Sequence, residues 1–195
     1  MIYTIGRYPV HLIDVIQAAD GSRVTIRPTL PQDVELQRAF FRALSPLSRY
    51  YRFMTPASEL PDTLVELFTN IDYRRHLALL AEVFDATGRE IMIGEARYVV
   101  DASDPTICEF AITVADDWHA HGIAHALLAR LERQAAASGI RKMAADTVIA
   151  NKVMRTLAAR AGYSLNAHRK DFELARLEKM LVASAGTATP PTIAA

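Results

Sequence analysis

The middle of the chain contains the stretch EFAITVADDWHAHGIAHALLARL, residues 109–131. Its first six residues alternate small or polar side chains with large apolar ones, which predicts a strand over residues 107–114. After a short loop, isoleucine and leucine recur at intervals of four, which predicts a helix over residues 122–138. The stretch therefore indicates a strand, a loop and a helix that begins at Gly122.

The beginning of this helix is suited to binding an anion. The first backbone amides of a helix have no partner within the helix, and the positive end of the helix dipole lies behind them. A glycine at this point lets a phosphate approach the backbone closely. Short glycine motifs also open ordinary helices, so Gly122 alone leaves a purely structural role open. No Gly-Lys-Ser/Thr follows, and the three spaced glycines of a dinucleotide fingerprint are missing, so neither of these nucleotide sites is indicated.

The segments on either side of this stretch predict a mixed sheet. Residues 76–84 and 90–100 are apolar runs separated by a short turn, and with residues 107–114 they indicate an antiparallel meander. Farther on, a strand over residues 142–149 precedes a helix over residues 151–161, and this order indicates a locally parallel crossover. The expected fold class is α/β, with an α+β type of mixed central sheet flanked by helices in a single domain.

The remaining segments complete the predicted layout. Further strands are predicted over residues 11–17 and 23–27 and within residues 163–177. Helices are predicted over residues 31–44 and 47–54 and from Pro61 onward. We accordingly divide the chain into an N-terminal extension with a short strand (residues 1–22), one folded domain (residues 23–181) and a flexible tail rich in small residues (residues 182–195).

Composition excludes several classes of function. The 195 residues suit one domain, and the 22 basic side chains balance the 22 acidic ones, which argues against a nucleic-acid binder. One cysteine, Cys108, excludes an internal disulfide framework and favours a reducing compartment. The sequence has no signal peptide and no apolar run near the roughly 20 residues that span a bilayer, so we expect a cytoplasmic protein without a membrane partner.

The loop and the first helical turn also carry a family motif. Residues 119–124, HAHGIA, resemble the signature of the GCN5-related N-acetyltransferases (GNAT), which reads Gln or Arg, two residues, Gly, one residue, then Gly or Ala. The resemblance extends over residues 23–177 and includes the segments RVTIRP, SPLSRYYRF, EFAITVADDW and NKVMRTLAARAGY. Within the family, the chain looks most like the catalytic domain of the bacterial Pat-type protein lysine acetyltransferases. It departs from the signature at His119, which replaces Gln or Arg.

The resemblance implies a binding site for acetyl-coenzyme A. It assigns the pyrophosphate to the backbone amides at the helix entrance and the pantetheine arm to the backbone of the preceding strand. Help from the side chain of His119 should be weaker than that of Gln or Arg and pH-dependent, because histidine is mostly neutral at pH 7. Asn151 either caps its helix or contacts the coenzyme. The residues assigned to the coenzyme are Ile112, Thr113, Val114, His119, His121, Gly122, Ile123, Ala124, His125 and Asn151.

Glu109 is the candidate catalytic base. Transfer to an ammonium requires loss of a proton before the nitrogen can attack, and a carboxylate can take that proton directly or through water. If its face of the strand is buried, its pKa should be raised. The alternative is that Glu109 only faces water, and the resemblance favours the base. Many relatives also have a tyrosine that protonates the departing thiolate, but its position corresponds to Ala158 here, so the resemblance supplies no dedicated general acid.

The remaining candidate groups suggest no further cofactor. His119, His121 and His125 lie where a loop enters a helix, and we expect no metal there. Arg49 to Arg52, the run RYYR, lies on the acceptor side in relatives and is either an ordinary helix surface or part of the acceptor site.

The predicted function is N-acetyl transfer from acetyl-coenzyme A to an amine, either a protein lysine or a small amine, by direct transfer with general-base assistance. Two alternatives are a catalytically weak acyl-coenzyme A sensor or interaction domain and a plain phosphate-binding module. Formation of a homodimer is left open.

Overall fold

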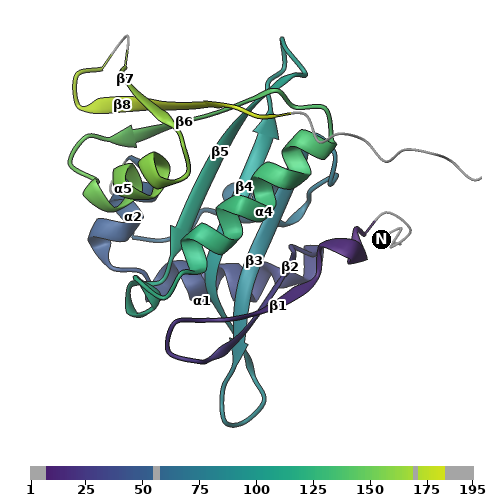
Figure 1. The fold of residues 1–195 in the computed structure, drawn as a ribbon. Coiled ribbons are helices and arrows are strands. Elements are labelled where there is room, and N and C mark those ends of the chain that lie inside the picture. Colours follow the sequence, from purple (N-terminus) through teal and green to yellow (C-terminus); the bar gives the residue numbers. More distant parts are fainter. Residues whose placement is uncertain (1–7, 55–57, 169–170, 183–195) are drawn as a thin grey trace, which may run out of the picture.

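A computed structural model describes residues 8–54, 58–168 and 171–182 (Figure 1). In this part of the chain, eight strands form one sheet in the order β1-β2-β3-β4-β5-β6-β8-β7. The strands are β1 (Asp14–Gln17), β2 (Arg23–Pro28), β3 (His76–Phe84), β4 (Glu90–Val100), β5 (Ile107–Val114), β6 (Lys142–Val148), β7 (Ser164–Ala167) and β8 (Leu174–Met180). The helices are α1 (Val34–Ala43), α2 (Pro46–Phe53), α3 (Asp62–Thr69), α4 (Ile123–Ala137) and α5 (Lys152–Arg160).

The predicted mixed sheet is confirmed. Every neighbouring pair of strands is antiparallel except β5 and β6, which are parallel because α4 carries the chain across between them. The strand predicted within residues 163–177 is in fact a pair, β7 and β8. The helix predicted from residue 31 begins as a short 3-10 turn, Pro31–Asp33, and becomes α-helical only at Val34.

The ends of the chain differ in part from the predicted layout. The first strand occupies only Asp14–Gln17, because a 3-10 turn forms over Val10–Leu12, and it pairs with β2 at the edge of the same sheet. Most of the predicted tail, residues 183–195, lies outside the described residues.

Helix α4 covers one face of the sheet (Figure 1). The four-residue stripe recognised in the sequence, Ile123, Leu127, Leu131 and Ala135, is buried against side chains of β3, β4 and β5. The helix approaches closely at Gly94 on β4, where an added Cβ would lie 3.3 Å from Leu127 and 3.4 Å from the Thr113 carbonyl oxygen. A side chain at this position would therefore force Leu127 or the backbone of β5 to shift by a few tenths of an ångström.

The opposite face carries α1 and α3 and contains a buried charged cluster. Two nitrogens of Arg97 donate to the Glu95 carboxylate, one of them to Oε1 at 2.8 Å, and Gln37 donates to Oε2 at 2.7 Å. Arg52 of α2 lies 3.6 Å from the same carboxylate. Burial alone would raise the pKa of Glu95, but the charges of Arg97 and Arg52 lower it to about 2. The cluster therefore holds α1 and α2 against β4.

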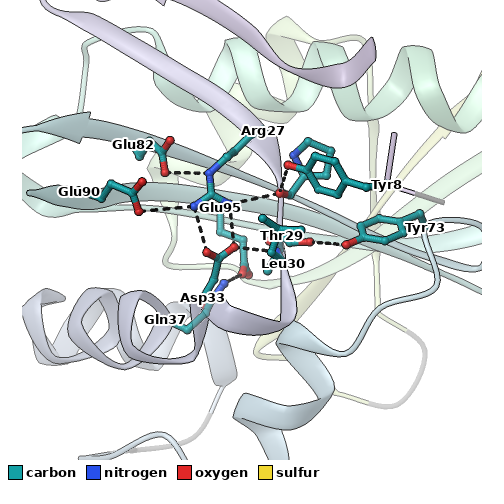
Figure 2. Close-up of polar contacts among 11 residues, drawn as sticks. Tyr8, Arg27, Thr29, Leu30, Asp33, Gln37, Tyr73, Glu82, Glu90 and Glu95 are labelled. Carbon is teal, nitrogen blue, oxygen red and sulfur yellow. Dashed lines mark hydrogen bonds and ion pairs between the residues drawn. The ribbon is translucent and has the colours of Figure 1, made fainter. Parts of the chain in front are cut away.

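A second ion cluster holds the chain where it leaves β2 for α1 (Figure 2). Arg27 donates to both oxygens of Asp33, at 2.8 and 3.0 Å, and to Glu82 on β3 at 3.0 Å. Asp33 also accepts from the Leu30 amide at 2.7 Å, which closes the turn before α1. Two parallel hydrogen bonds between a guanidinium and a carboxylate fix the relative orientation of the two groups as well as their distance. The Arg27–Asp33 pair therefore orients the start of α1 on the sheet.

Replacing Glu95 with glutamine should destabilise the fold. Arg97 and Arg52 would stay buried without their counter-charge, so we expect the free energy of unfolding to fall by about 3–5 kcal/mol in urea titrations. The folded pKa of about 2 lies below the unfolded value of roughly 4.3. Wild-type protein should therefore lose this stabilisation as the pH falls from about 4.3 toward 2, and the variant should lack that part of the acid dependence.

Glu90→Gln, at the exposed start of β4, is the matched control for this prediction. Glu90 lies 3.9 Å from Arg27 and its side chain is 47% exposed, so the loss of stability should stay within about 1 kcal/mol, as for other exposed ion pairs. Equal losses in the two variants would contradict a special role for the buried cluster.

Candidate active site

Strands β5 and β6 pair over only three residues and then separate. The parallel register runs Ile107↔Lys142, Cys108↔Met143 and Glu109↔Ala144, and it ends there (Figure 1). Beyond this point, residues 110–114 and 145–148 diverge; we call the opening between them the fork. β5 keeps its ladder with β4 as far as Val114. Its other backbone edge has no strand partner among the described residues.

A cavity of about 420 Å³ occupies the fork. Its walls come from the diverging strands, from α2 on one side, and from α5 and the first turn of α4 on the other. Ile112, Thr113 and Val114, which the sequence assigned to the pantetheine arm, all line it. An extended ligand could pair with the free edge of β5 as an added strand would.

The entrance of α4 lies at one end of the cavity, where His119 and Ala124 contribute to the wall. Gly122 is the N-cap residue and has φ of 84°, a left-handed conformation that glycine adopts without strain. An added Cβ would meet nothing within 4 Å, so there is open space beside the backbone here. No side chain caps the helix, and its first amides remain available to an anion.

The side chains of the predicted anion site lie in different environments, although their backbone amides share one helix entrance. Ile123 is buried in the core, so only its amide can contribute, whereas His125 is exposed on the first turn. His119 places Nε2 3.0 Å from the Val114 carbonyl oxygen, which fixes its ring over the end of β5. His121 instead donates from Nδ1 to the His119 carbonyl oxygen at 2.8 Å and faces Asp20 in the β1–β2 turn. The His121 side chain therefore does not line the cavity.

Asp116 connects this loop to the start of α2. Its carboxylate accepts from the amide and hydroxyl of Ser45 at 2.9 and 2.8 Å and from the Ser48 hydroxyl at 2.7 Å. Burial by itself would raise the pKa of Asp116, but the hydrogen bonds from Ser45 and Ser48 lower it by more, so the pKa lies below its ordinary value. Sequence reasoning missed Asp116, because it lies 71 positions from its partner Ser45 and carries no local motif.

Glu109 lies at the apex of the fork, on the face of the sheet toward α2. Its side chain is 62% exposed, so this face of the strand is open to solvent at Glu109. Its Oε1 accepts from Nη1 of Arg176 at 2.9 Å, and the same nitrogen donates to Oδ2 of Asp146 at 2.9 Å. Glu109 and Asp146 both line the cavity. Sequence reasoning missed Asp146 and Arg176, which come from β6 and β8 and carry no local motif.

Asn151 caps α5, as one of its two interpretations predicted. Its Oδ1 accepts from the Met154 amide at 3.0 Å, and the residue is buried at the cavity wall. Contact with the coenzyme stays a prediction. From α2, Tyr51 and Arg52 of the RYYR run also line the cavity, but Arg52 is engaged with Glu95.

No general acid reaches the cavity from position 158, where many relatives have a tyrosine. Ala158 is buried in the core, and Tyr163 packs against Phe110 with ring centroids 5.1 Å apart. Among the described residues, no group of three or more His, Cys, Asp or Glu side chains is arranged to hold a metal ion. Within the same residues, no helix combines the length and apolar character needed to cross a membrane.

Comparisons with known proteins agree with this geometry. The family model "Acetyltransferase (GNAT) family" matches residues 44–163. An acetyltransferase of Pseudomonas aeruginosa is 33% identical over 144 residues, covering 74% of this chain and 76% of that protein. The acetyltransferase Pat of Mycolicibacterium smegmatis is 29% identical over 147 residues, covering 75% of this chain and 43% of that protein.

Among solved structures, the GNAT domain of S. lividans PAT has a TM-score of 0.81 and 30% identity, covering 89% of this chain and 99% of that one. The family match includes the fork, the entrance of α4 and α5. This chain belongs to the acetyltransferase (GNAT) family.

Proposed function

We propose that this acetyltransferase moves an acetyl group from acetyl-coenzyme A directly to a primary amine that arrives as a cation, with Glu109 as general base. The observation that carries the proposal is the fork: a free strand edge leads from an uncapped helix entrance to a carboxylate at its apex. The proposed catalytic domain is residues 23–181.

The chain offers suitable groups for a long ligand that is anionic at one end. The amides of Gly122, Ile123, Ala124 and His125 would hold the pyrophosphate, since uncapped helix amides and the helix dipole both favour an anion. The backbone of Ile112 to Val114 would pair with the pantetheine arm. Bound in this way, acetyl-coenzyme A supplies an acetyl group activated as a thioester.

Charge on the cavity wall favours a cationic acceptor. Three lining side chains, Glu109, Asp116 and Asp146, are carboxylates, and one, Arg52, is a guanidinium already paired with Glu95. Asp116 is held by two serines, whereas Glu109 and Asp146 share a single nitrogen of Arg176, so these two carboxylates keep a net negative charge that can meet an incoming ammonium. A lysine side chain or a small alkylamine fits this requirement.

Glu109 would remove one proton from the acceptor's ammonium, directly or through water, and so free the nitrogen lone pair. The nitrogen then attacks the thioester carbonyl carbon, a C–N bond forms and the C–S bond breaks. The nitrogen loses a second proton to become an amide, and the thiolate takes a proton from solvent, because no acid from the Ala158 position reaches the cavity. Catalysis by this chain then depends on the base and on positioning.

The sensor alternative is not favoured, because the related proteins are acetyltransferases by name. A cytoplasmic location and homodimer formation stay predictions.

Coenzyme binding should depend on the entrance of α4. Gly122→Asp would bring a carboxylate to the proposed pyrophosphate site, so we expect acetyl-coenzyme A affinity to fall at least tenfold, which is about 1.4 kcal/mol or more. Isothermal titration calorimetry measures this change.

Gly88→Asp provides a matched control, because Gly88 also has positive φ and open space but lies in the β3–β4 turn. Unchanged affinity in a folded Gly122 variant would exclude the proposed pyrophosphate site.

Removal of the base should slow turnover while leaving coenzyme affinity nearly constant. Glu109→Gln keeps size and shape, and general-base assistance is typically worth about 100- to 10,000-fold, so the acetylation rate at pH 7 should fall within that range. The deficit should shrink as the pH rises toward the lysine pKa of about 10.4, because more acceptor is already neutral. Thiol release measured from about pH 6.5 to about pH 9.5 records both the deficit at neutral pH and its decrease at higher pH. A variant as fast as wild type near pH 7 would remove Glu109 from the mechanism.

A further inference from the structure

A single nitrogen of Arg176 joins two carboxylates of the fork. Nη1 lies 2.9 Å from Oε1 of Glu109 and 2.9 Å from Oδ2 of Asp146. Asp146 lies directly opposite Arg176 in the β6–β8 ladder, two residues beyond the last β6 residue that pairs with β5. The two carboxylates thus come from the two diverging strands, and a positively charged nitrogen occupies the point between them.

This contact is easily exchanged. All three side chains are partly exposed to solvent, Glu109 most of all. Ion pairs of this kind usually change an equilibrium by about fivefold or less. A second cation that enters the cavity can therefore replace Arg176 at small cost.

Asp146 also has unused capacity to accept hydrogen bonds. Its Oδ1 is buried and has no hydrogen-bond partner among the described residues, while Oδ2 is the oxygen that faces Arg176. An ionised carboxylate accepts several donors, and a primary ammonium brings three. Asp146 lines the cavity, so its carboxylate can meet such a donor through Oδ2 in place of Arg176, or through Oδ1 once the carboxylate rotates.

We propose that Asp146 determines the acceptor specificity of this enzyme. An alkylammonium acceptor, such as a lysine side chain, takes the place of Arg176 Nη1 between the two carboxylates. Asp146 holds the ammonium while Glu109 receives its proton, and a neutral aromatic amine lacks the charge that this site selects. The inference rests on the proposed function and adds to it a residue that favours a positively charged acceptor over a neutral one.

The first test compares two acceptors, a lysine-containing peptide and the neutral arylamine p-anisidine, in wild-type protein and in Asp146→Asn. Loss of a charged hydrogen bond typically costs about tenfold or more, so KM for the peptide should rise at least tenfold, with kcat changed much less. The ratio of kcat/KM for peptide over arylamine should fall by a similar factor. Equal losses for both acceptors would overturn the proposal.

Arg176→Gln provides a test with the opposite sign. If the acceptor replaces Arg176, its removal should lower KM for the peptide by up to about fivefold, the usual limit for an exposed ion pair. A purely structural Arg176 would leave KM unchanged or raise it, and either result would overturn the replacement.

Glu66→Gln, on the exposed surface of α3, makes the same change of net charge as Asp146→Asn outside the cavity and should leave all constants unchanged. Acetyl-coenzyme A affinity and thermal unfolding report whether each variant is folded. Wild-type protein that binds acetyl-coenzyme A but turns over neither acceptor would overturn the proposed function and this inference together. Wild-type turnover with no change of acceptor preference in Asp146→Asn would overturn only the inference.

Discussion

The site depends on the separation of β5 and β6 after three residue pairs. Buried backbone amides and carbonyls that lack a partner are costly, so a strand edge inside a protein must pair or face water or a ligand. The cavity in the fork satisfies this requirement for β5 and leaves its backbone available to an extended ligand. The parallel crossover through α4 then brings the entrance of that helix to the same opening.

Two glycines allow this arrangement for different physical reasons. Gly94 has no side chain because α4 lies so close to β4 that a Cβ would meet Leu127 and the backbone of β5. Gly122 has open space around it, and its role comes from the left-handed φ with which the chain enters the helix. Asp116 then attaches the same loop to Ser45 and Ser48 at the start of α2. The two sides of the cavity are therefore held by a single short segment.

Burial distinguishes the two groups of charges near the cavity. Glu95 and Arg97 are enclosed beneath α1, and removing either partner would leave an uncompensated charge, so this cluster supports the fold. Glu109, Asp146 and Arg176 remain open to water, where an ion pair is weak and exchangeable. Carboxylates and guanidinium groups thus have a structural role where they are buried and a proposed chemical role where they are open to water.

Local sequence determined most of the elements and the glycine that opens α4, because each follows from residue types only a few positions apart. The order of these elements along the chain indicated the mixed sheet, and the motif with its flanking segments indicated the family. Local sequence did not predict that α1 begins only at Val34, where Asp33 is held by Arg27, and it left open whether Glu109 is buried or faces water. Nor could it predict the meeting of Glu109 with Arg176, 67 residues away, or of Asp116 with Ser45. These contacts depend on strand order, on register and on where two strands diverge, and such properties arise only when distant segments pack together.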